Sequence, residues 1–456
     1  MAQDSLQRLC PYCFETFALN KVDFRCEDPR CALTESLKDD NQLTQYERDV
    51  SNDFNIPPAR RPHYWSYDVI VAEQNRLEAA KKRADADKSV WAKIRDKVEH
   101  AKNGLGTKQA NSVVQDYATC PDYHTVTHTM LCPHCHNNLP HTIVEQDNEV
   151  IAIVGSRTTG KTVFASSLLL ALRDRGPRDW GIQLIPITDT TDFERDGPDE
   201  LEAGRVPPST PMRGARPALY RLQPGDESRP GTLKRPVTLA FFDVAGEIYD
   251  TLGNVESFAR YVVQARGIIY LVDPFQLTAV RQSMENKAAQ TGSRFTMPVS
   301  LPITESPQKT LNVLDRLFRE KRIVKGQEKV AKSVAVTFTK SDEMLQAELL
   351  RSPNIPDQTI YSGDPNDYHA DGFKSEVFKS VDKETRAVLG ATDAGSALAQ
   401  RLNTTFFPVG FFCVSALGTR PNDDMTINRN ESRPHRVEDP LLWMLDTLDA
   451  LHGPTK

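Results

Sequence analysis

The chain has 456 residues, enough for roughly two or three domains, and its 39% hydrophobic and 26% charged residues are typical of a soluble globular protein. A formal net charge of −6 argues against a general attraction to nucleic acid or to anionic membranes. No run approaches the roughly 18 apolar residues of a membrane-spanning helix, and the first residues lack the apolar core of a signal peptide, so we expect a cytoplasmic protein with reduced cysteines.

The cysteines gather in the first part of the chain, where seven of the eight precede residue 150. Two Cys-x-x-Cys pairs, CPYC at 10–13 and CPHC at 132–135, have the spacing that lets two thiolates meet at one tetrahedral Zn²⁺. Together they would complete a closed four-cysteine site, which we expect to be structural because it has no open position for water. The zinc would then contribute folding free energy to a polar segment.

A second zinc site is expected from the ligands that remain, which are Cys26, Cys31, Cys120 and His124. Sequential pairing is the alternative: the cysteines at 10–31 would form one site, and those at 120–135 would form the other with His124. Four further histidines, at 128, 134, 136 and 141, lie close to His124 in the sequence and compete with it for the eighth ligand position. In both arrangements the ligands are Cys10, Cys13, Cys26, Cys31, Cys120, His124, Cys132 and Cys135.

The segment between the two Cys-rich halves, 1–35 and 118–145, is rich in Ala, Glu, Lys and Arg. Its scattered apolar positions predict a helical insert at about 60–105. Acidic residues alternate with the basic ones, which favours a solvated helix face over a nucleic-acid-binding patch. We therefore expect a zinc-ribbon module at 1–145 and a second domain at 146–456.

The second domain opens with EVIAIVGSRTTGKTVFASSLLLALRDRG (149–176), in which an apolar strand is followed by two spaced glycines and an amphipathic helix. The turn has the pattern G-x-x-x-x-G-K-[ST] in the strand–turn–helix context of a phosphate-binding loop. Backbone N–H groups would hold phosphates at the helix N-terminus, Lys161 would reach the β and γ phosphates, and Thr162 would bind Mg²⁺. The loop residues expected at the nucleotide are Gly155, Ser156, Arg157, Thr158, Thr159, Gly160, Lys161 and Thr162.

A second apolar strand, in RPVTLAFFDVAGE, leads into Asp243 and Gly246. The aspartate could bind Mg²⁺ through water, and the glycine N–H could face a γ-phosphate. Another buried strand, GIIYLVDP (267–274), follows it along the chain.

Two later strands lead into residues suited to a guanine base. KSVAVTFTKSDE ends in an aspartate whose carboxylate can accept from guanine N1–H and the 2-amino group, whereas adenine lacks this pair of donors. FFPVGFFCVSALG runs into a turn whose backbone N–H groups could donate to guanine O6. The residues expected at the base are Thr339, Lys340, Asp342, Ser415, Ala416 and Leu417.

The order of these motifs, G-x-x-x-x-G-K-T, D-x-x-G, T-K-x-D and S-A-L, resembles that of the Ras-like (TRAFAC-class) P-loop GTPases from residue 149 to the C-terminus. The resemblance implies an α/β domain with a mostly parallel sheet flanked by helices, which binds GTP with Mg²⁺ and acts as a slow hydrolase and switch. Nucleotide binding at strand C-termini agrees with the general rule for α/β sheets. The Cys-rich ribbon, the long inserts and a final helix in RPHRVEDPLLWMLDTLDAL (433–451) look like the bacterial double-GTPase type found with conflict-system genes.

The resemblance also implies a threonine that binds Mg²⁺ and the γ-phosphate shortly before the strand we expect at PALYRLQ (217–223). Thr210 fits this position best, and Thr188, Thr190 and Thr191 are the alternatives. The surrounding loop, 189–231, is long and rich in Pro, Gly and charge, so we expect it to be mobile until nucleotide or a partner orders it.

Two residues depart from the Ras pattern. Glu247 stands where a glutamine usually orients the attacking water; its carboxylate could position or deprotonate that water but adds negative charge beside the γ-phosphate. Arg157 replaces a small glycine of the phosphate loop, and we expect it to point to solvent rather than to stabilise the transition state.

Two connections are longer than one crossover helix needs. We expect a loop and a helix from about Ser306 before the strand at Ser333, and a crossover helix with an irregular insert between Leu345 and Pro408.

These features predict a GTP-binding protein that hydrolyses GTP slowly with Mg²⁺ and meets a protein partner through its zinc module or its nucleotide-sensitive loops. A GTP-loaded scaffold with little hydrolysis is the alternative, favoured by Glu247 and the lack of an evident arginine finger. A P-loop ATPase with a nucleic-acid-binding ribbon is a third hypothesis, opposed by the T-K-x-D motif and the acidic balance. The residues expected to act in hydrolysis or to bind Mg²⁺ are Lys161, Thr162, Thr210, Asp243 and Glu247.

Overall fold

The structure is a computed structural model of the chain. It describes residues 7–25, 64–66, 117–119, 124–144, 149–156, 159–187, 190–208, 218–225, 228–241, 255–278, 281–282, 286, 307–320, 328–346, 360, 369, 371–390, 392–428 and 432–453. The chain divides into two compact units. The N-terminal unit comprises Met1–Arg48 and Phe54–Asn148, and the C-terminal unit comprises Asp49–Asp53 and Glu149–Lys456.

The described part of the N-terminal unit consists of very short strands. β1 (Gln7–Leu9) pairs antiparallel with β2 (Thr16–Ala18), and β5 (Ala118–Thr119) pairs with β6 (Val126–Thr127). β3 (Asp23–Arg25) lies between β4 (Tyr64–Ser66) and β7 (Met130–Leu131), and two 3-10 turns, η2 (Leu19–Lys21) and η4 (His141–Ile143), complete the unit. The expectation of helix from about residue 60 is wrong for Tyr64–Ser66, since pairing with β3 overrides local helix propensity there; the rest of the predicted insert lies outside the described residues.

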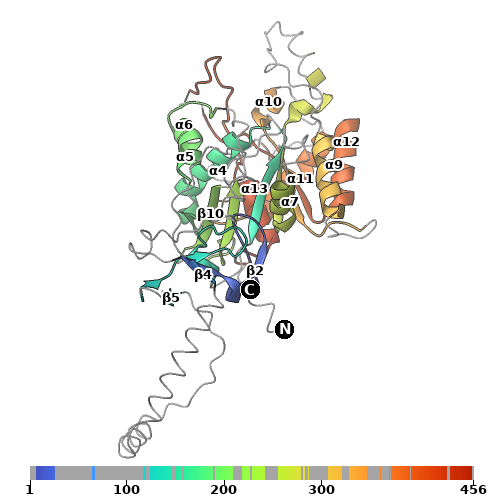
Figure 1. Ribbon diagram of the computed structural model, residues 1–456. Coiled ribbons are helices and arrows are strands. Elements are labelled where there is room, and N and C mark those ends of the chain that lie inside the picture. The colour runs from blue at the N-terminus through green and yellow to red at the C-terminus, as the bar shows by residue number, and fades with distance from the viewer. Residues whose placement is uncertain are drawn as a thin grey trace, which may run out of the picture. The chain divides into compact units, whose positions relative to one another are not determined.

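The C-terminal unit is built on a seven-stranded sheet in the order β14-β13-β12-β8-β11-β10-β9. Five neighbouring strands are parallel, and β10 and β9 add an antiparallel edge. The strands are β8 (Val150–Gly155), β9 (Ile182–Pro186), β10 (Ala218–Pro224), β11 (Val237–Phe241), β12 (Gly267–Val272), β13 (Ser333–Phe338) and β14 (Val409–Cys413). The parallel strands are apolar and almost wholly buried, as expected of a sheet covered on both faces. The predicted fold class, a mostly parallel α/β sheet flanked by helices, is confirmed (Figure 1).

Helices follow most of these strands. They are α4 (Lys161–Asp174), η5 (Gly176–Trp180), α5 (Thr191–Asp196), α6 (Pro198–Glu202), α7 (Val255–Gln264), η7 (Pro274–Gln276), α9 (Pro307–Glu320), α10 (Ser341–Gln346), α11 (Ser375–Gly390), α12 (Asp393–Thr405) and α13 (Asp439–Thr447). α4 and α13 share one apolar core with β8 and β12, in which Phe164, Leu168 and Trp443 pack with Ile151 and Ile269. α9 begins next to the position predicted for a helix from about Ser306.

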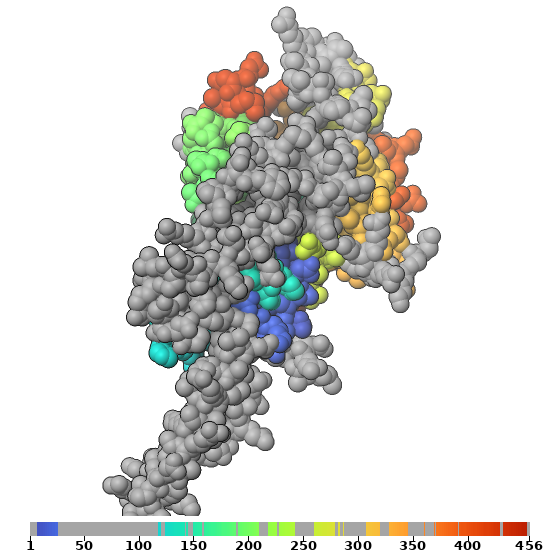
Figure 2. All heavy atoms as spheres, in the orientation of Figure 1, coloured from blue at the N-terminus to red at the C-terminus, as the bar shows by residue number. Residues whose placement is uncertain are grey.

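The segment expected to be a mobile loop, 189–231, is partly regular. Its described residues contain α5, α6 and β10, the last at the position predicted for a strand. Residues 204–206 also pair with 425–427: Val206 N–H donates to Met425 O (2.9 Å), and Ile427 N–H donates to Gly204 O (2.8 Å). Figure 2 shows the two segments side by side, in green and in orange-red.

The C-terminal helix starts later than predicted. α13 begins at Asp439, where Pro440 occupies the first turn and its missing N–H costs nothing. Residues 433–438 are not helical; Arg436 has a left-handed φ of 55°, and Ser415 pairs with His435 as an isolated bridge.

Candidate nucleotide and metal sites

The phosphate loop joins β8 to α4. Gly155 ends the strand, and a Cβ there would lie 2.7 Å from Thr159 Oγ1 and 3.0 Å from Leu271 Cβ. Gly160 caps α4 with φ 76°, in the left-handed region that glycine reaches without strain. The helix N-terminus therefore faces the loop, with the partial positive charge that favours phosphate.

Lys161 is held against this loop. Its Nζ donates to the carbonyl oxygens of Gly155 (3.0 Å) and Ser156 (3.2 Å), so the ammonium lies beside the backbone that would surround a phosphate. Thr159 Oγ1 donates to Ser156 O at 2.8 Å, which closes the turn internally. Thr162 is the second residue of α4, the position at which its hydroxyl can serve a metal at the loop.

Three strand ends meet beside the loop. β8, β12, β13 and β14 are neighbours and run parallel, so the residues that follow them lie along one edge of the sheet. Thr339–Asp342 follows β13 directly, with Lys340 at φ 55° and Asp342 in the first turn of α10. Ser415 lies two residues beyond the end of β14.

Two of the residues expected at the base, Asp342 and Ser415, contact each other. Ser415 Oγ donates to Asp342 Oδ1 at 2.6 Å, which ties the T-K-x-D and S-A-L segments together and fixes one carboxylate oxygen. Gly418 N–H donates to Ser415 Oγ at 2.8 Å, so the hydroxyl is held from both sides. This geometry leaves the second oxygen of Asp342 available for a base donor.

Several residues of the predicted site lie outside the described residues. They are Arg157, Thr158, Thr188, Thr210, Asp243, Gly246 and Glu247. β11 ends at Phe241 and pairs in parallel with β8, so the C-terminal end of β11 lies at the same edge of the sheet as the phosphate loop. Of the alternative threonines, Thr190 and Thr191 stand at the start of α5.

The two Cys-x-x-Cys pairs meet in the N-terminal unit. The sulfur atoms of Cys10, Cys13, Cys132 and Cys135 all lie within 4.8 Å of one another, and all four residues are buried. Cys10 Sγ is 3.8 Å from Cys135 Sγ, and Cys13 Sγ is 3.8 Å from Cys132 Sγ. The sequential pairing is therefore excluded for these four cysteines, because it would place the two pairs in different sites.

The two pairs have the same local geometry. Cys10 N–H donates to Glu15 O (2.9 Å) and Cys132 N–H to Asn137 O (3.0 Å), while Phe14 and His136 both have left-handed φ values. Backbone N–H groups also point at the sulfurs, from Tyr12 to Cys10 Sγ and from His134 to Cys132 Sγ, each at 3.4 Å. Such donors stabilise thiolates, so both turns are shaped to present negative sulfur.

The four sulfurs fit a tetrahedral metal. Zinc–sulfur bonds of about 2.3 Å imply sulfur–sulfur separations of about 3.8 Å across a tetrahedron. Without a cation, burial raises the pKa of the Cys10 thiol, because four clustered sulfurs cannot all ionise away from water. The chemistry of the cluster thus suits Zn²⁺ and leaves no ligand position for a reacting water.

Of the four ligands predicted for the second zinc site, three lie outside the described residues: Cys26, Cys31 and Cys120. His124 is described and exposed, with φ 56°. Among the other histidines, His134 Nε2 lies 3.3 Å from Thr16 O and His136 Nε2 lies 3.3 Å from Asp23 Oδ2, so both have partners in the protein.

Comparison with known proteins matches the residues of this nucleotide site to a protein family. Residues 149–360 match the Double-GTPase 2 family, a range that includes the phosphate loop and the T-K-x-D motif. Residues 149–360 form a Double-GTPase 2 domain. The Ser415–Leu417 segment lies beyond the matched residues, after β14 of the same sheet.

One curated relative and two solved structures are similar to the chain. SaeC of Mycolicibacterium smegmatis, named for a proposed role in ESX-1 scaffolding and assembly, is 25% identical over 342 residues, which cover 70% of this chain and 80% of SaeC. The GTPase-like domain of S. cerevisiae Ski7, solved with GDP and inorganic phosphate, is 12% identical with a TM-score of 0.27, covering 66% of this chain and 50% of that one. The SRb-GTP/SRX complex of the signal recognition particle receptor from Chaetomium thermophilum is 13% identical with a TM-score of 0.22, covering 61% of this chain and 95% of that one.

Within the described residues, no helix combines the length and apolar composition needed to cross a membrane.

The Double-GTPase 2 domain holds one residue beside the expected base site that sequence analysis did not single out, Asp273. Asp273 follows β12, is fully buried and accepts from Phe275 N–H at 2.9 Å. Its other oxygen receives Lys340 Nζ at 2.6 Å, while the Lys340 ammonium lies 5.7 Å from the Phe275 ring. The strand GIIYLVDP contained the signal, an aspartate at the C-terminal end of a buried parallel strand.

Asp273→Asn is expected to weaken GTP binding by the Double-GTPase 2 domain about tenfold, because the neutral amide no longer holds the Lys340 ammonium beside the base. Titration calorimetry measures the effect. Asp315→Asn on α9, which loses only ion pairs with Arg319 and Arg401, is the matched control and should bind GTP as the wild type does. Equal affinities in all three proteins would show that Asp273 does not position Lys340.

Proposed function

We propose that the protein binds GTP with Mg²⁺, hydrolyses it slowly and acts as a nucleotide-dependent switch. The observation that carries the proposal is the Asp342 carboxylate, held by Ser415 at 2.6 Å at the same sheet edge as the phosphate loop. A fixed carboxylate acceptor suits the N1–H and 2-amino donors of guanine, whereas adenine has an acceptor at N1 and no 2-amino group. This favours GTP over ATP.

The proposed roles follow from the order of the loops. Lys161 and the loop N–H groups bind the β and γ phosphates, and Gly246 senses the γ-phosphate. Thr162, Asp243 and Thr210 would hold Mg²⁺, which neutralises charge on the phosphate oxygens. Lys340 lays its stem along the base, and Ala416 and Leu417 donate to O6.

Hydrolysis would depend on Glu247. A carboxylate there can orient the attacking water or accept its proton, but its charge also repels the γ-phosphate. We therefore propose an intrinsic turnover on the order of 10⁻⁴ to 10⁻² per second, as in related sites that lack an arginine finger. A partner that docks on the nucleotide-sensitive loops or the zinc module would set the rate in the cell.

A GTP-loaded scaffold with little hydrolysis is the second candidate function. The name of the relative SaeC, which refers to scaffolding and assembly, favours it, and so does the charge of Glu247. In this version GTP stabilises the domain as a structural ligand. A role in a bacterial conflict system is the finer proposal that the double-GTPase resemblance adds to either function. The ATPase hypothesis is less well supported, because adenine lacks the N1–H and 2-amino donors that would bind the Asp342 carboxylate.

The N-terminal unit would serve as a zinc-stabilised docking module. We propose zinc at the four-cysteine cluster, and a second zinc held by Cys26, Cys31, Cys120 and His124. Neither site would take part in catalysis, since closed sites offer no water position.

The test of the proposed function is Lys161→Ala. Loss of a charge-assisted phosphate contact is expected to weaken GTP binding about 100-fold and to abolish Mg²⁺-dependent GDP production, which chromatography follows over hours. Lys383→Ala, the same substitution on the exposed face of α11, should change neither. ATP replaces GTP in a parallel series.

The outcomes separate the candidates. GDP production that depends on Lys161 supports the switch. Tight Lys161-dependent GTP binding without turnover supports the scaffold. Equal use of ATP and GTP would contradict the guanine assignment.

A further inference from the structure

A segment far along the chain closes over the turn that follows β14. We name residues 432–439 the C-terminal clasp. Ser415 and His435 exchange two backbone hydrogen bonds, with Ser415 N–H donating to His435 O (3.0 Å) and His435 N–H donating to Ser415 O (2.7 Å). Leu417 O accepts from Arg433 N–H at 3.1 Å and from Ser432 Oγ at 3.0 Å. The clasp thus provides hydrogen-bond partners for the N–H and carbonyl groups of Ser415 and for the carbonyl oxygen of Leu417.

Two backbone N–H groups of the turn are not used by the clasp. In the part of the chain that the structure describes, the N–H groups of Ala416 and Leu417 have no acceptor. These are the donors that would meet a base carbonyl such as guanine O6. The clasp therefore sets the direction of those two N–H groups by fixing the residues on either side of them.

The turn and the clasp approach each other too closely for any side chain between them. Gly418 has φ 70°, and a Cβ there would lie 1.8 Å from Arg433 O and 2.3 Å from Arg433 C. Backbone atoms cannot yield to such an overlap as a flexible side chain could. A larger residue at 418 must therefore move the turn, the clasp or both.

A cavity of about 300 Å³ lies against Ala416 and Leu417, between them and Leu170 of α4. Pro434 and Val437 of the clasp line the same cavity. Beside this cavity, the clasp supports the turn together with the hydrogen bond from Ser415 to Asp342.

The clasp is itself anchored by buried polar contacts. Arg436, 1% exposed, donates from Nε to Ile360 O (3.2 Å) and from Nη1 to Asp439 Oδ2 (3.0 Å). His435 Nε2 lies 2.6 Å from the same carbonyl oxygen, and Asp439 Oδ1 lies 3.4 Å from His369 Nε2. These contacts join the clasp to the insert that precedes α11.

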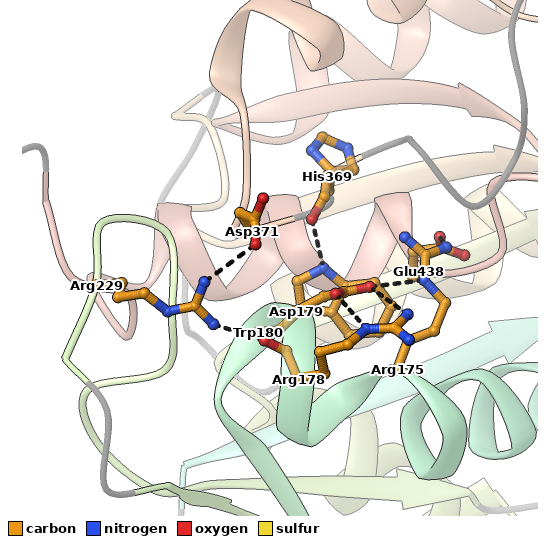
Figure 3. A network of polar contacts seen from close by, with 8 residues as sticks. All are labelled: Arg175, Arg178, Asp179, Trp180, Arg229, His369, Asp371 and Glu438. Atoms are coloured by element: carbon orange, nitrogen blue, oxygen red, sulfur yellow. Dashed lines mark hydrogen bonds and ion pairs between the residues drawn. The ribbon is translucent and has the colours of Figure 1, made fainter.

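A second anchor reaches the end of α4. Arg175 donates from Nη1 to Glu438 Oε1 (2.8 Å) and from Nε to Asp179 Oδ2 (2.9 Å), and its guanidinium stacks on Trp180 (Figure 3). Trp180 Nε1 in turn donates to His369 O at 3.1 Å. α4 begins at the phosphate loop, so one buried network connects the clasp to the helix that carries Lys161.

We propose that the C-terminal clasp is the positioning element for recognition of the base carbonyl, with Gly418 and Ser432 as specificity-determining positions. The clasp holds the Ala416 and Leu417 N–H groups toward O6 of a bound guanine nucleotide. This inference rests on the proposed function, because it requires that the base site binds guanine. The clasp acts on selectivity between bases that differ at position 6.

The test compares GTP with 6-thio-GTP, which keeps N1–H and the 2-amino group but replaces O6 by a weaker sulfur acceptor. The wild type is expected to bind GTP about tenfold more tightly than 6-thio-GTP. Gly418→Ala should bring this ratio close to one, while GTP affinity falls about tenfold. Ser432→Ala, which removes a single half-buried hydrogen bond and should fold normally, is expected to lower the ratio about threefold.

Gly390→Ala is the matched control, since a Cβ at the end of α11 meets no atom within 4 Å. Thermal unfolding of each variant checks that the domain is folded. If the wild type shows no preference for GTP over 6-thio-GTP, O6 is not recognised and the inference is overturned, whereas equal binding of ATP and GTP would show that the guanine site of the proposed function fails. If the wild type shows the preference but Gly418→Ala and Ser432→Ala lose affinity for both nucleotides equally, the clasp is only structural and the inference is overturned.

Discussion

Cys132→Ser is expected to release zinc and to unfold the N-terminal unit while the C-terminal unit stays folded. Structural zinc sites contribute about 10–16 kcal/mol of apparent binding free energy, which is folding free energy when the site does not exist in the unfolded chain. The described strands of this unit have only two or three residues each, too short to be stable alone. Loss of one sulfur from the cluster therefore removes the main source of stability.

Metal analysis by mass spectrometry and limited proteolysis measure the effect. The zinc content is expected to fall by about one per chain or more, and cleavage should appear before residue 149 while the C-terminal unit resists. GTP binding should persist, because the two units are separate compact bodies.

Cys413→Ser is the matched control, since Cys413 is a buried thiol of β14 that accepts from Thr385 Oγ1 at 3.6 Å. Burial raises the pKa of this thiol to about 12, so it is neutral and serves packing. The control variant should keep the full zinc content. A Cys132→Ser protein with unchanged zinc and an intact N-terminal unit would contradict a metal role for the cluster.

Local patterns carry most of the fold prediction. The spacing of Gly155, Gly160 and Lys161 predicts the phosphate loop, because a left-handed glycine and a helix start are encoded within a few residues. The two Cys-x-x-Cys pairs likewise predict their own turns. The sequence leaves open which pair joins which, because that choice depends on β3 pairing with β7 over a long stretch of chain.

Contacts between distant segments account for the differences between prediction and structure. Asp273 meets Lys340 only because β12 and β13 are neighbours, an arrangement decided by the whole sheet. The final apolar segment predicts a helix over 433–451, yet His435 pairs with Ser415 and the helix begins only at Asp439. Local helix propensity is overridden where a buried backbone N–H or carbonyl group forms a hydrogen bond with a distant segment.

Asp342→Asn is expected to reverse the nucleotide preference from GTP to xanthosine triphosphate. The carboxylate accepts from guanine N1–H and the 2-amino group, whereas an asparagine amide can donate to the C2 carbonyl of xanthine. A site built around specific hydrogen bonds discriminates by about 10⁴, so the ratio of GTP to xanthosine triphosphate affinities should change by that order. Competition binding with a fluorescent nucleotide measures both affinities.

The Asp342→Asn variant should keep the shape of the site, which makes the prediction sharp. The side-chain oxygen of an asparagine can still accept from Ser415 Oγ, as the Asp342 carboxylate does at 2.6 Å, so the turn after β14 keeps its support. Glu343→Gln is the matched control one residue along α10; it removes a charge that lies 3.7 Å from Arg420 and should leave the preference for GTP unchanged. If Asp342→Asn binds GTP as tightly as the wild type, Asp342 does not read the base, and the guanine assignment falls with it.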